Sequence, residues 1–139
     1  MPANTQFSIA IHVMAALACG CDKDLTSGDL ALSVNTSPSF VRRVLAKLSR
    51  AGLVETATGK AGKTWLARDP KRISLLDIYR AVDAPAAFAI HDYAERKACP
   101  VSCHIKAALD KALGKTQKAM EASLDETSLA QVVSEMRKK

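Results

Sequence analysis

The chain has 139 residues, 48% of them hydrophobic and only 4% aromatic, and its formal net charge is +6. This length accommodates one domain with a buried core and an additional arm. The apolar run from Phe7 to Cys19 has no basic lead-in and is far shorter than the roughly 20 residues that span a bilayer. We therefore expect no membrane span, no targeting segment and a cytoplasmic protein. Thiols stay reduced in that compartment, so the four cysteines are expected to be buried, metal-binding or redox-active rather than paired in disulfides.

The first part of the chain predicts three helices. Ser37 followed by Pro38 is a preferred way to begin the third helix, and Gly52 is expected to end it. A short turn, residues 34–36, separates the third helix from the second. Asn4 or Thr5 is expected to cap a first helix that runs to about Ala18, and Thr26 or Ser27 a second helix that runs to about Ser33.

The third helix separates apolar from basic side chains. Its buried face is expected to contain Phe40, Val41, Val44, Leu45 and Leu48, and its other face Arg42, Arg43, Lys47 and Arg50. Two short strands, residues 53–56 and 63–67, follow around Gly59 and Gly62 and predict a wing. Residues 37–72 hold nine Lys or Arg and two acids, so the positive excess of the chain is concentrated there. Two helices that meet across a tight turn, with a basic second helix, form the unit that enters the DNA major groove.

The rest of the chain predicts one short, one long and one terminal helix. Ser74 is expected to cap a helix that runs through Val82, and residues 83–98 to form a loop with at most one helical turn. Pro100 begins a long helix in which apolar residues recur every three or four positions. Thr127 or Ser128 is expected to cap a final short helix.

The predicted fold is mainly α, a winged helix-turn-helix with a two-stranded wing and a long C-terminal dimerisation helix. We expect residues 1–83 to form the DNA-binding domain, and residues 84–139 the loop, the long helix and the terminal helix. The winged module leaves no obvious groove for the long helix, so we expect it to pack on its copy in a second subunit. The alternative is that it folds back on its own module.

Several segments resemble the Rrf2 family of bacterial winged-helix repressors, and within it the small YwnA-type subgroup. They are SIAIHVMAAL at 8–17, SVNTSPSFVRRVLAKL at 33–48, ISLLDIYRAVD at 73–83, CPV at 99–101 and the C-terminal helix. The resemblance implies a dimer with long helices that cross between subunits, and a repressor that binds a palindromic operator. It places the helix that begins at Ser37 in the major groove and the loop 58–63 near the minor groove. Thr58 stands where the family usually has arginine, so a minor-groove arginine is not expected here.

The candidate DNA contacts lie on the third helix and the wing. Arg42 and Arg43 are expected to reach base edges, because arginine can donate two hydrogen bonds to guanine. Solvated arginines are the alternative interpretation. Ser37 and Ser39 are candidates for phosphate or base contacts, although Ser37 is equally explained as a helix cap. The remaining candidates, expected to contact phosphates only, are Lys47, Arg50, Lys60 and Lys63.

The cysteines leave several roles open. Cys99 and Cys103 lie beside His104, with His91 nearby, in a region where iron–sulfur members of the family carry three cysteines. A [2Fe–2S] cluster, a redox-sensing thiol near a helix N-terminus and a purely structural use all remain possible here. Cys19 and Cys21 form a C-x-C pair that is expected to be buried or half-buried, with metal binding as the alternative. Two other residues are also expected to have structural roles. His12 is interpreted as a core histidine. Trp65 is expected to pack between a wing strand and the module, and a contact of Trp65 with a DNA groove is the alternative.

No enzyme motif is present. GKAGKT at 59–64 lacks the first glycine of a phosphate-binding loop, because Ala57 stands there, and a strand rather than a helix follows. The sequence therefore predicts a homodimeric DNA-binding regulator, without a resident metal, that acts at a pseudo-palindromic operator. One alternative is an iron–sulfur or thiol redox-sensing regulator that uses Cys99 and Cys103. Two others are a redox or metal-carrying protein whose basic face serves another purpose, and a winged helix that binds another protein.

Overall fold

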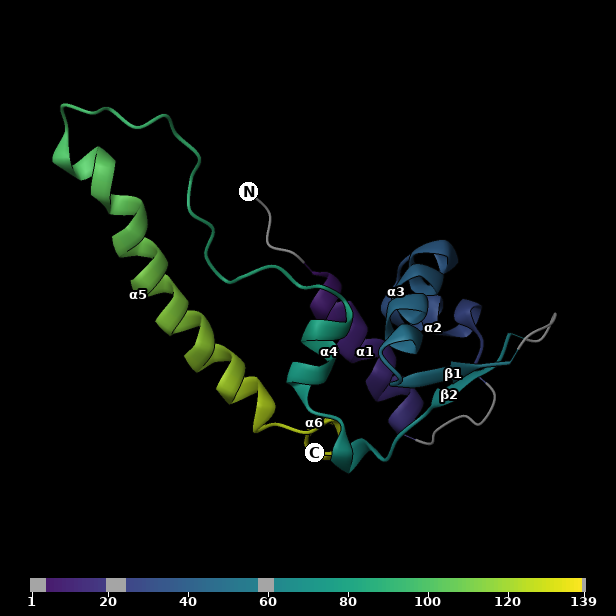
Figure 1. Cartoon of the computed structure of the whole chain (residues 1–139). Coiled ribbons are helices and arrows are strands. Elements are labelled where there is room, and N and C mark those ends of the chain that lie inside the picture. The colour runs from purple at the N-terminus through teal and green to yellow at the C-terminus, as the bar shows by residue number, and fades with distance from the viewer. Residues whose placement is uncertain (1–4, 20–24, 58–61, 139) are drawn as a thin grey trace. The chain divides into compact units, whose positions relative to one another are not determined.

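A computed structural model describes residues 5–19, 25–57 and 62–138. The chain divides into two compact units, residues 1–84 together with 124–139, and residues 85–123. The elements, shown in Figure 1, are α1 (Gln6–Ala18), α2 (Ser27–Val34), α3 (Pro38–Arg50), β1 (Val54–Thr56), β2 (Thr64–Leu66), η1 (Pro70–Arg72), α4 (Leu75–Ala81), α5 (Pro100–Asp125) and α6 (Leu129–Arg137). The predicted mainly helical, winged helix-turn-helix fold is confirmed.

Helices α2, α3, α4 and α6 begin where a side chain accepts a hydrogen bond from a free N–H of the first turn. Thr5 precedes α1 but makes no such bond, and Asn4, the other predicted cap, lies outside the described residues. Three of them carry capping boxes, in which the capping side chain and the residue three positions later bond each other's backbone. The pairs are Thr26 with Asp29, Ser74 with Asp77, and Ser128 with Gln131. Ser37 caps α3 by accepting a hydrogen bond of 3.2 Å from the Phe40 N–H, and Pro38 fills the first helical position.

Two left-handed residues set the geometry around α3. Asn35 has φ 63° and ends α2, and asparagine tolerates this conformation better than most residues. Gly52 has φ 77° and ends α3, where the Leu53 N–H reaches back 3.0 Å to the Leu48 carbonyl. This is the six-to-one hydrogen bond of a helix that closes on glycine. The turn and the glycine stop therefore fix both ends of the candidate recognition helix.

The wing is an antiparallel hairpin with Val54 opposite Leu66 and Thr56 opposite Thr64. Its second strand is also tied to the segment before α2, because the Thr64 N–H donates 3.0 Å to the Leu25 carbonyl. The hydroxyl of Thr64, a residue only 3% exposed, has no hydrogen-bond partner within the described part of the chain. The strand alternation turns Thr64 inward and Trp65 outward.

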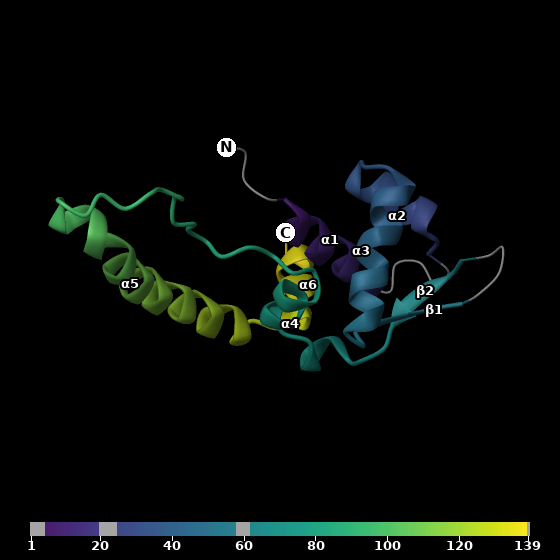
Figure 2. The ribbon, with the colours of Figure 1, turned by 45° about the horizontal axis from the view of Figure 1, so that its top comes forward.

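The core of the first unit is built around α1, which packs against α2, α3, α4, α6 and β2 (Figure 2). The fully buried side chains of α1 include Val13 and Met14. Leu129 and Val133 of α6 are buried in the same core, and the Leu129 N–H donates 2.8 Å to the Ile73 carbonyl. The terminal helix α6 thus packs in the first unit. The division expected from the sequence, residues 1–83 and 84–139, placed it together with the long helix.

The second unit consists of α5 and the segment before it. Residues 85–98 form neither helix nor strand and are held along α5 by hydrogen bonds, including one of 2.6 Å from the Tyr93 hydroxyl to the Ser102 carbonyl and one of 3.0 Å from the Ala87 N–H to Gln117. All of α5 is described, and none of its residues is buried. Val101 near its start is 66% exposed. The apolar positions of α5 are therefore only partly covered within the second unit.

Two single-residue predictions are wrong. Trp65 does not pack on the module: it is 44% exposed, and its indole N–H donates 2.9 Å to Glu55, its partner across the hairpin. His12 is not a core histidine, because its side chain is exposed and its Nε2 lies 3.0 Å from the Ser33 hydroxyl of α2. In both cases the residue lies on the outward face of its element.

Candidate nucleic-acid interface

Helix α3 has one buried and one basic face. The buried side chains are Val41, Val44, Leu45 and Leu48, as the sequence predicted, while Phe40 is half-buried. No acidic residue occurs between Pro38 and Arg50. Because the apolar face is occupied by the core, the other face is left to solvent and carries uncompensated positive charge. Such a face attracts the phosphates of a nucleic acid.

Helix geometry orders the residues of the exposed face. At about 100° per residue, Ser39, Arg43, Ala46 and Arg50 fall within about 60° of one another, opposite the buried side chains. We call these four residues the outer stripe of α3. Arg42 lies on one flank of the stripe, and the half-buried Lys47 lies on the other. Side chains of the stripe would project most directly into a groove.

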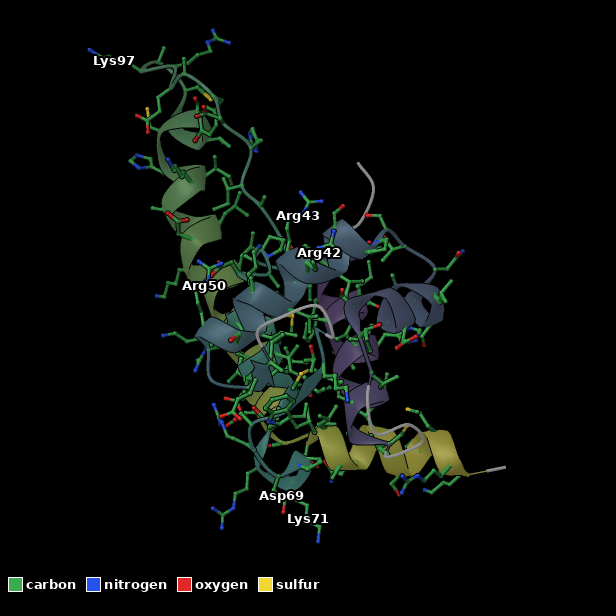
Figure 3. All side chains as sticks on the ribbon, turned by 90° about the vertical axis from the view of Figure 1, so that its right-hand side faces the viewer. Arg42, Arg43, Arg50, Asp69, Lys71 and Lys97 are labelled. Atoms are coloured by element: carbon green, nitrogen blue, oxygen red, sulfur yellow. The ribbon has the colours of Figure 1, made fainter. Side chains whose placement is uncertain are left out.

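The two central arginines differ in their surroundings. The Arg43 guanidinium carbon lies 5.4 Å from the centre of the Phe40 ring, a distance that allows a cation–π contact. Arg42 makes no hydrogen bond or ion pair with the described residues. Both are exposed and project from the same end of α3 (Figure 3). Phe40, which sequence reasoning placed only in the core, therefore also limits the orientations of Arg43.

Small polar and apolar residues surround the arginines. Ser37 and Ser39 are exposed at the N-terminus of α3, with their hydroxyl oxygens 3.3 Å apart. A helix N-terminus favours a phosphate oxygen. Ala46 is exposed and has the smallest side chain of the outer stripe, so the helix backbone is most accessible at this position. Arg50 donates a hydrogen bond of 3.4 Å from Nε to the Ala46 carbonyl, which leaves its terminal nitrogens available.

The structure describes only part of the predicted wing contacts. Lys63 is exposed and forms an isolated bridge with Thr26, whereas Lys60 lies outside the described residues. Farther along the chain, Lys71 is exposed but lies at the opposite end of this unit from Arg42 and Arg43 (Figure 3). The basic residues of the segment 37–72 therefore do not all face one way.

The predicted redox residues surround the start of α5. Cys99 precedes the helix, and its sulfur accepts a hydrogen bond of 3.4 Å from the Ser102 N–H. The Cys103 thiol donates 3.4 Å to the Arg96 carbonyl, and His104 is exposed. Both cysteines are half-buried and are not paired in a disulfide.

The described residues do not fit an iron–sulfur cluster. A [2Fe–2S] cluster needs four ligands, and no group of three or more His, Cys, Asp or Glu that could hold a metal occurs in the part of the chain that the structure describes. Cys19 is half-buried, with its thiol directed to the Ala16 carbonyl at 3.4 Å, while Cys21 lies outside the described residues.

The described helices do not meet the requirements of a membrane span. None of them combines the length and the apolar character that a transmembrane helix needs.

Comparisons with known proteins agree with this geometry. The Rrf2 family model, described as an iron-dependent transcriptional regulator, matches residues 3–135. YwnA of Bacillus subtilis, named as an HTH-type transcriptional regulator, is 37% identical over 134 residues, which are 96% of this chain and 98% of YwnA. A crystal structure described as that of a DNA-binding protein has a TM-score of 0.74 at 35% identity and covers 91% of this chain and 97% of its own. IscR of T. potens shares the fold, with a TM-score of 0.71 at 22% identity over 99% of this chain and 89% of IscR.

Proposed function

The chain belongs to the Rrf2 family of transcriptional regulators, as its segments predicted, and we propose that it is a homodimeric repressor that binds a pseudo-palindromic operator. The family consists of regulators rather than enzymes, in agreement with the absence of a catalytic motif from the sequence. In the proposed complex, α3 of each subunit enters the major groove, and bound repressor occludes the promoter.

The observation that carries this proposal is that α3 has an apolar face and a basic face. Its apolar face is occupied by the core, and its free face carries Arg42, Arg43 and Arg50 without a single acid in the helix. Arg43 and Arg42 are assigned to base edges, where arginine is the commonest specific reader of guanine. Contacts to phosphate, which position the protein without specifying sequence, are assigned to Ser37, Ser39, Lys47, Arg50, Lys60 and Lys63.

The proposal of a dimer is supported by α5. This helix has 26 residues, a length of about 39 Å, and its apolar positions are only partly covered by the segment that packs along it in the second unit. A second copy would cover them. Two recognition helices in one assembly also suit DNA, because successive major grooves on one side of a duplex are about 34–36 Å apart.

Fluorescence anisotropy on the promoter region upstream of the protein's own gene tests the proposal. If two subunits neutralise about eight phosphates, the logarithm of affinity should fall against the logarithm of salt with a slope of about −7. The matched comparison is the Arg42→Ala/Arg43→Ala protein, on the promoter fragment and on a scrambled duplex. The proposal fails if the wild type prefers neither duplex over heparin, or if its mass in analytical ultracentrifugation is the 14.9 kDa of one chain.

A further inference from the structure

An open pocket of about 780 Å³ lies in the first unit between α1, α2 and α6. The wall is mainly apolar and includes Phe7, Ile11, Leu30, Val132 and Met136. Figure 3 shows α2 and α6, the latter in yellow, flanking α1. The volume falls within the range of about 300–1,000 Å³ that is typical of small-molecule sites. Met136 is 55% exposed, so an occupant would cover an apolar side chain that now faces water.

The polar groups of the wall are few and mostly uncharged. His12 of α1 and Ser33 of α2 lie on the wall, with the histidine Nε2 3.0 Å from the serine hydroxyl. No lysine or arginine is among the described lining residues, and the nearby Arg137 guanidinium is engaged by the Cys19 carbonyl. The one carboxylate, Asp29, is already engaged by the N–H and hydroxyl of Thr26 at 3.0 and 2.9 Å. The chemistry of the described part of the wall thus favours a neutral ligand.

The pocket is connected to the recognition helix through α2. Leu30 and Ser33 line the pocket from α2, and α2 packs directly on α3 and joins it through the turn at Asn35. The His12–Ser33 hydrogen bond links α1 to α2 across the pocket wall. A ligand that inserts a hydrogen-bonding group here would replace that link and displace α2, and α3 with it.

We propose that this pocket binds a neutral, mainly apolar organic molecule with one hydrogen-bonding group, and that its occupancy lowers the affinity for DNA. The binding site stands on the pocket alone, whereas the effect on DNA rests on the proposed function. The ligand is expected to contact the apolar walls and to bond His12 or Ser33. The pocket is thus the inducer site of the repressor.

The probe for the first test is 1-aminoanthracene, a neutral three-ring amine whose fluorescence rises in apolar surroundings. Titration of the full chain without DNA should give saturable binding with one site per chain. Ser8→Trp and Ala16→Trp place a large side chain in the pocket and should each weaken probe binding at least tenfold. Ala86→Trp, at an exposed position outside the pocket, is the matched control and should bind like the wild type.

The outcomes of this test distinguish a small-molecule ligand from a second copy of the chain as the occupant of the pocket. Circular dichroism melting identifies a variant that fails to fold, and Ser8, an exposed residue, is the safer of the two positions. No saturable binding to the wild type, or equal binding to both filled variants, overturns the proposal. It is also overturned if folded Ser8→Trp changes the oligomeric mass, because the pocket would then be covered by a second copy.

The second test measures the coupling to DNA. Saturating probe should weaken anisotropy-detected binding of the promoter duplex at least about fivefold, the lower end of ordinary allosteric coupling. Linkage requires that saturating DNA weaken probe binding by the same factor. Probe binding without any change in DNA affinity overturns the inducer role. A chain that binds the probe but no DNA refutes the proposed function and, with it, the inducer role, but leaves the binding site intact.

Discussion

Arg43 offers the sharpest test of the recognition helix. It lies in the middle of the outer stripe of α3, exposed and oriented by the Phe40 ring. A bidentate contact from arginine to guanine discriminates by about 1–3 kcal/mol. A homodimer makes the contact twice, so Arg43→Ala should weaken specific binding by about 2–6 kcal/mol. This range corresponds to a loss of about 30-fold to about 20,000-fold at about 1.4 kcal/mol per factor of ten.

The substitution also removes one positive charge per subunit. The loss of affinity that this charge causes must be separated from the loss of base recognition. A phosphate contact is lost equally from every sequence, whereas a base contact is lost only from the specific site. Anisotropy titrations should therefore compare the promoter fragment with a scrambled duplex of equal length at one salt concentration. The expected result is a collapse of the ratio between the two affinities. Lys138→Ala removes an exposed charge at the end of α6 and should leave that ratio unchanged.

Two results would refute the assignment of Arg43. An equal loss on both duplexes would mean that Arg43 contacts phosphate. If Arg42→Ala collapses the ratio while Arg43→Ala does not, the face of α3 that meets DNA is centred on the flank rather than on the outer stripe. In either case the basic helix would remain the DNA-binding element, but its orientation in the groove would differ.

Three further predictions concern the groove-facing surface and the fold. Ala46→Leu should abolish promoter binding in a gel-shift assay with little change in melting temperature, because the position is exposed but is expected to approach the bases; unchanged binding would contradict this placement. Thr64→Val should raise the free energy of unfolding in urea by about 1 kcal/mol, since it removes a buried hydroxyl without a partner in the described chain; a loss of stability would show that the hydroxyl is bonded. The Thr26 backbone N–H, and then the Thr26 hydroxyl, hold the pKa of Asp29 below its ordinary value of 3.8, so the stabilisation by the carboxylate is present above that pH and is lost as the pH falls below it. Asp29→Asn should therefore lower the melting temperature at pH 7 and reduce the decline of the melting temperature between pH 7 and pH 3. An unaltered decline would argue against the cap.

The local features of the fold could be predicted from the sequence because they depend on neighbouring residues. Ser37 before Pro38, Ser74 three residues before Asp77, and Gly52 after the basic helix each act within one turn. The amphipathic pattern of α3 is similarly local. These signals are sufficient to predict the helix-turn-helix, the wing and the basic face, because none of them depends on a tertiary contact.

The features that could not be predicted depend on residues far apart in the sequence. Whether α6 packs in the first unit depends on Leu129 meeting Ile73, which no local pattern indicates. Trp65 is expected to pack between a wing strand and the module, but strand alternation and its hydrogen bond to Glu55 place it on the outer side of the hairpin. The pocket could not be predicted either, because three separate helices supply its wall.

Methylation protection by dimethyl sulfate tests the central claim most directly, that two copies of α3 occupy successive major grooves. The reagent modifies guanine N7 in the major groove and adenine N3 in the minor groove. On the promoter fragment the account predicts two clusters of protected guanines, centred about 10–10.5 base pairs apart, and loss of both clusters with Arg42→Ala/Arg43→Ala. Protection confined to adenine N3, or a single guanine cluster, would contradict it.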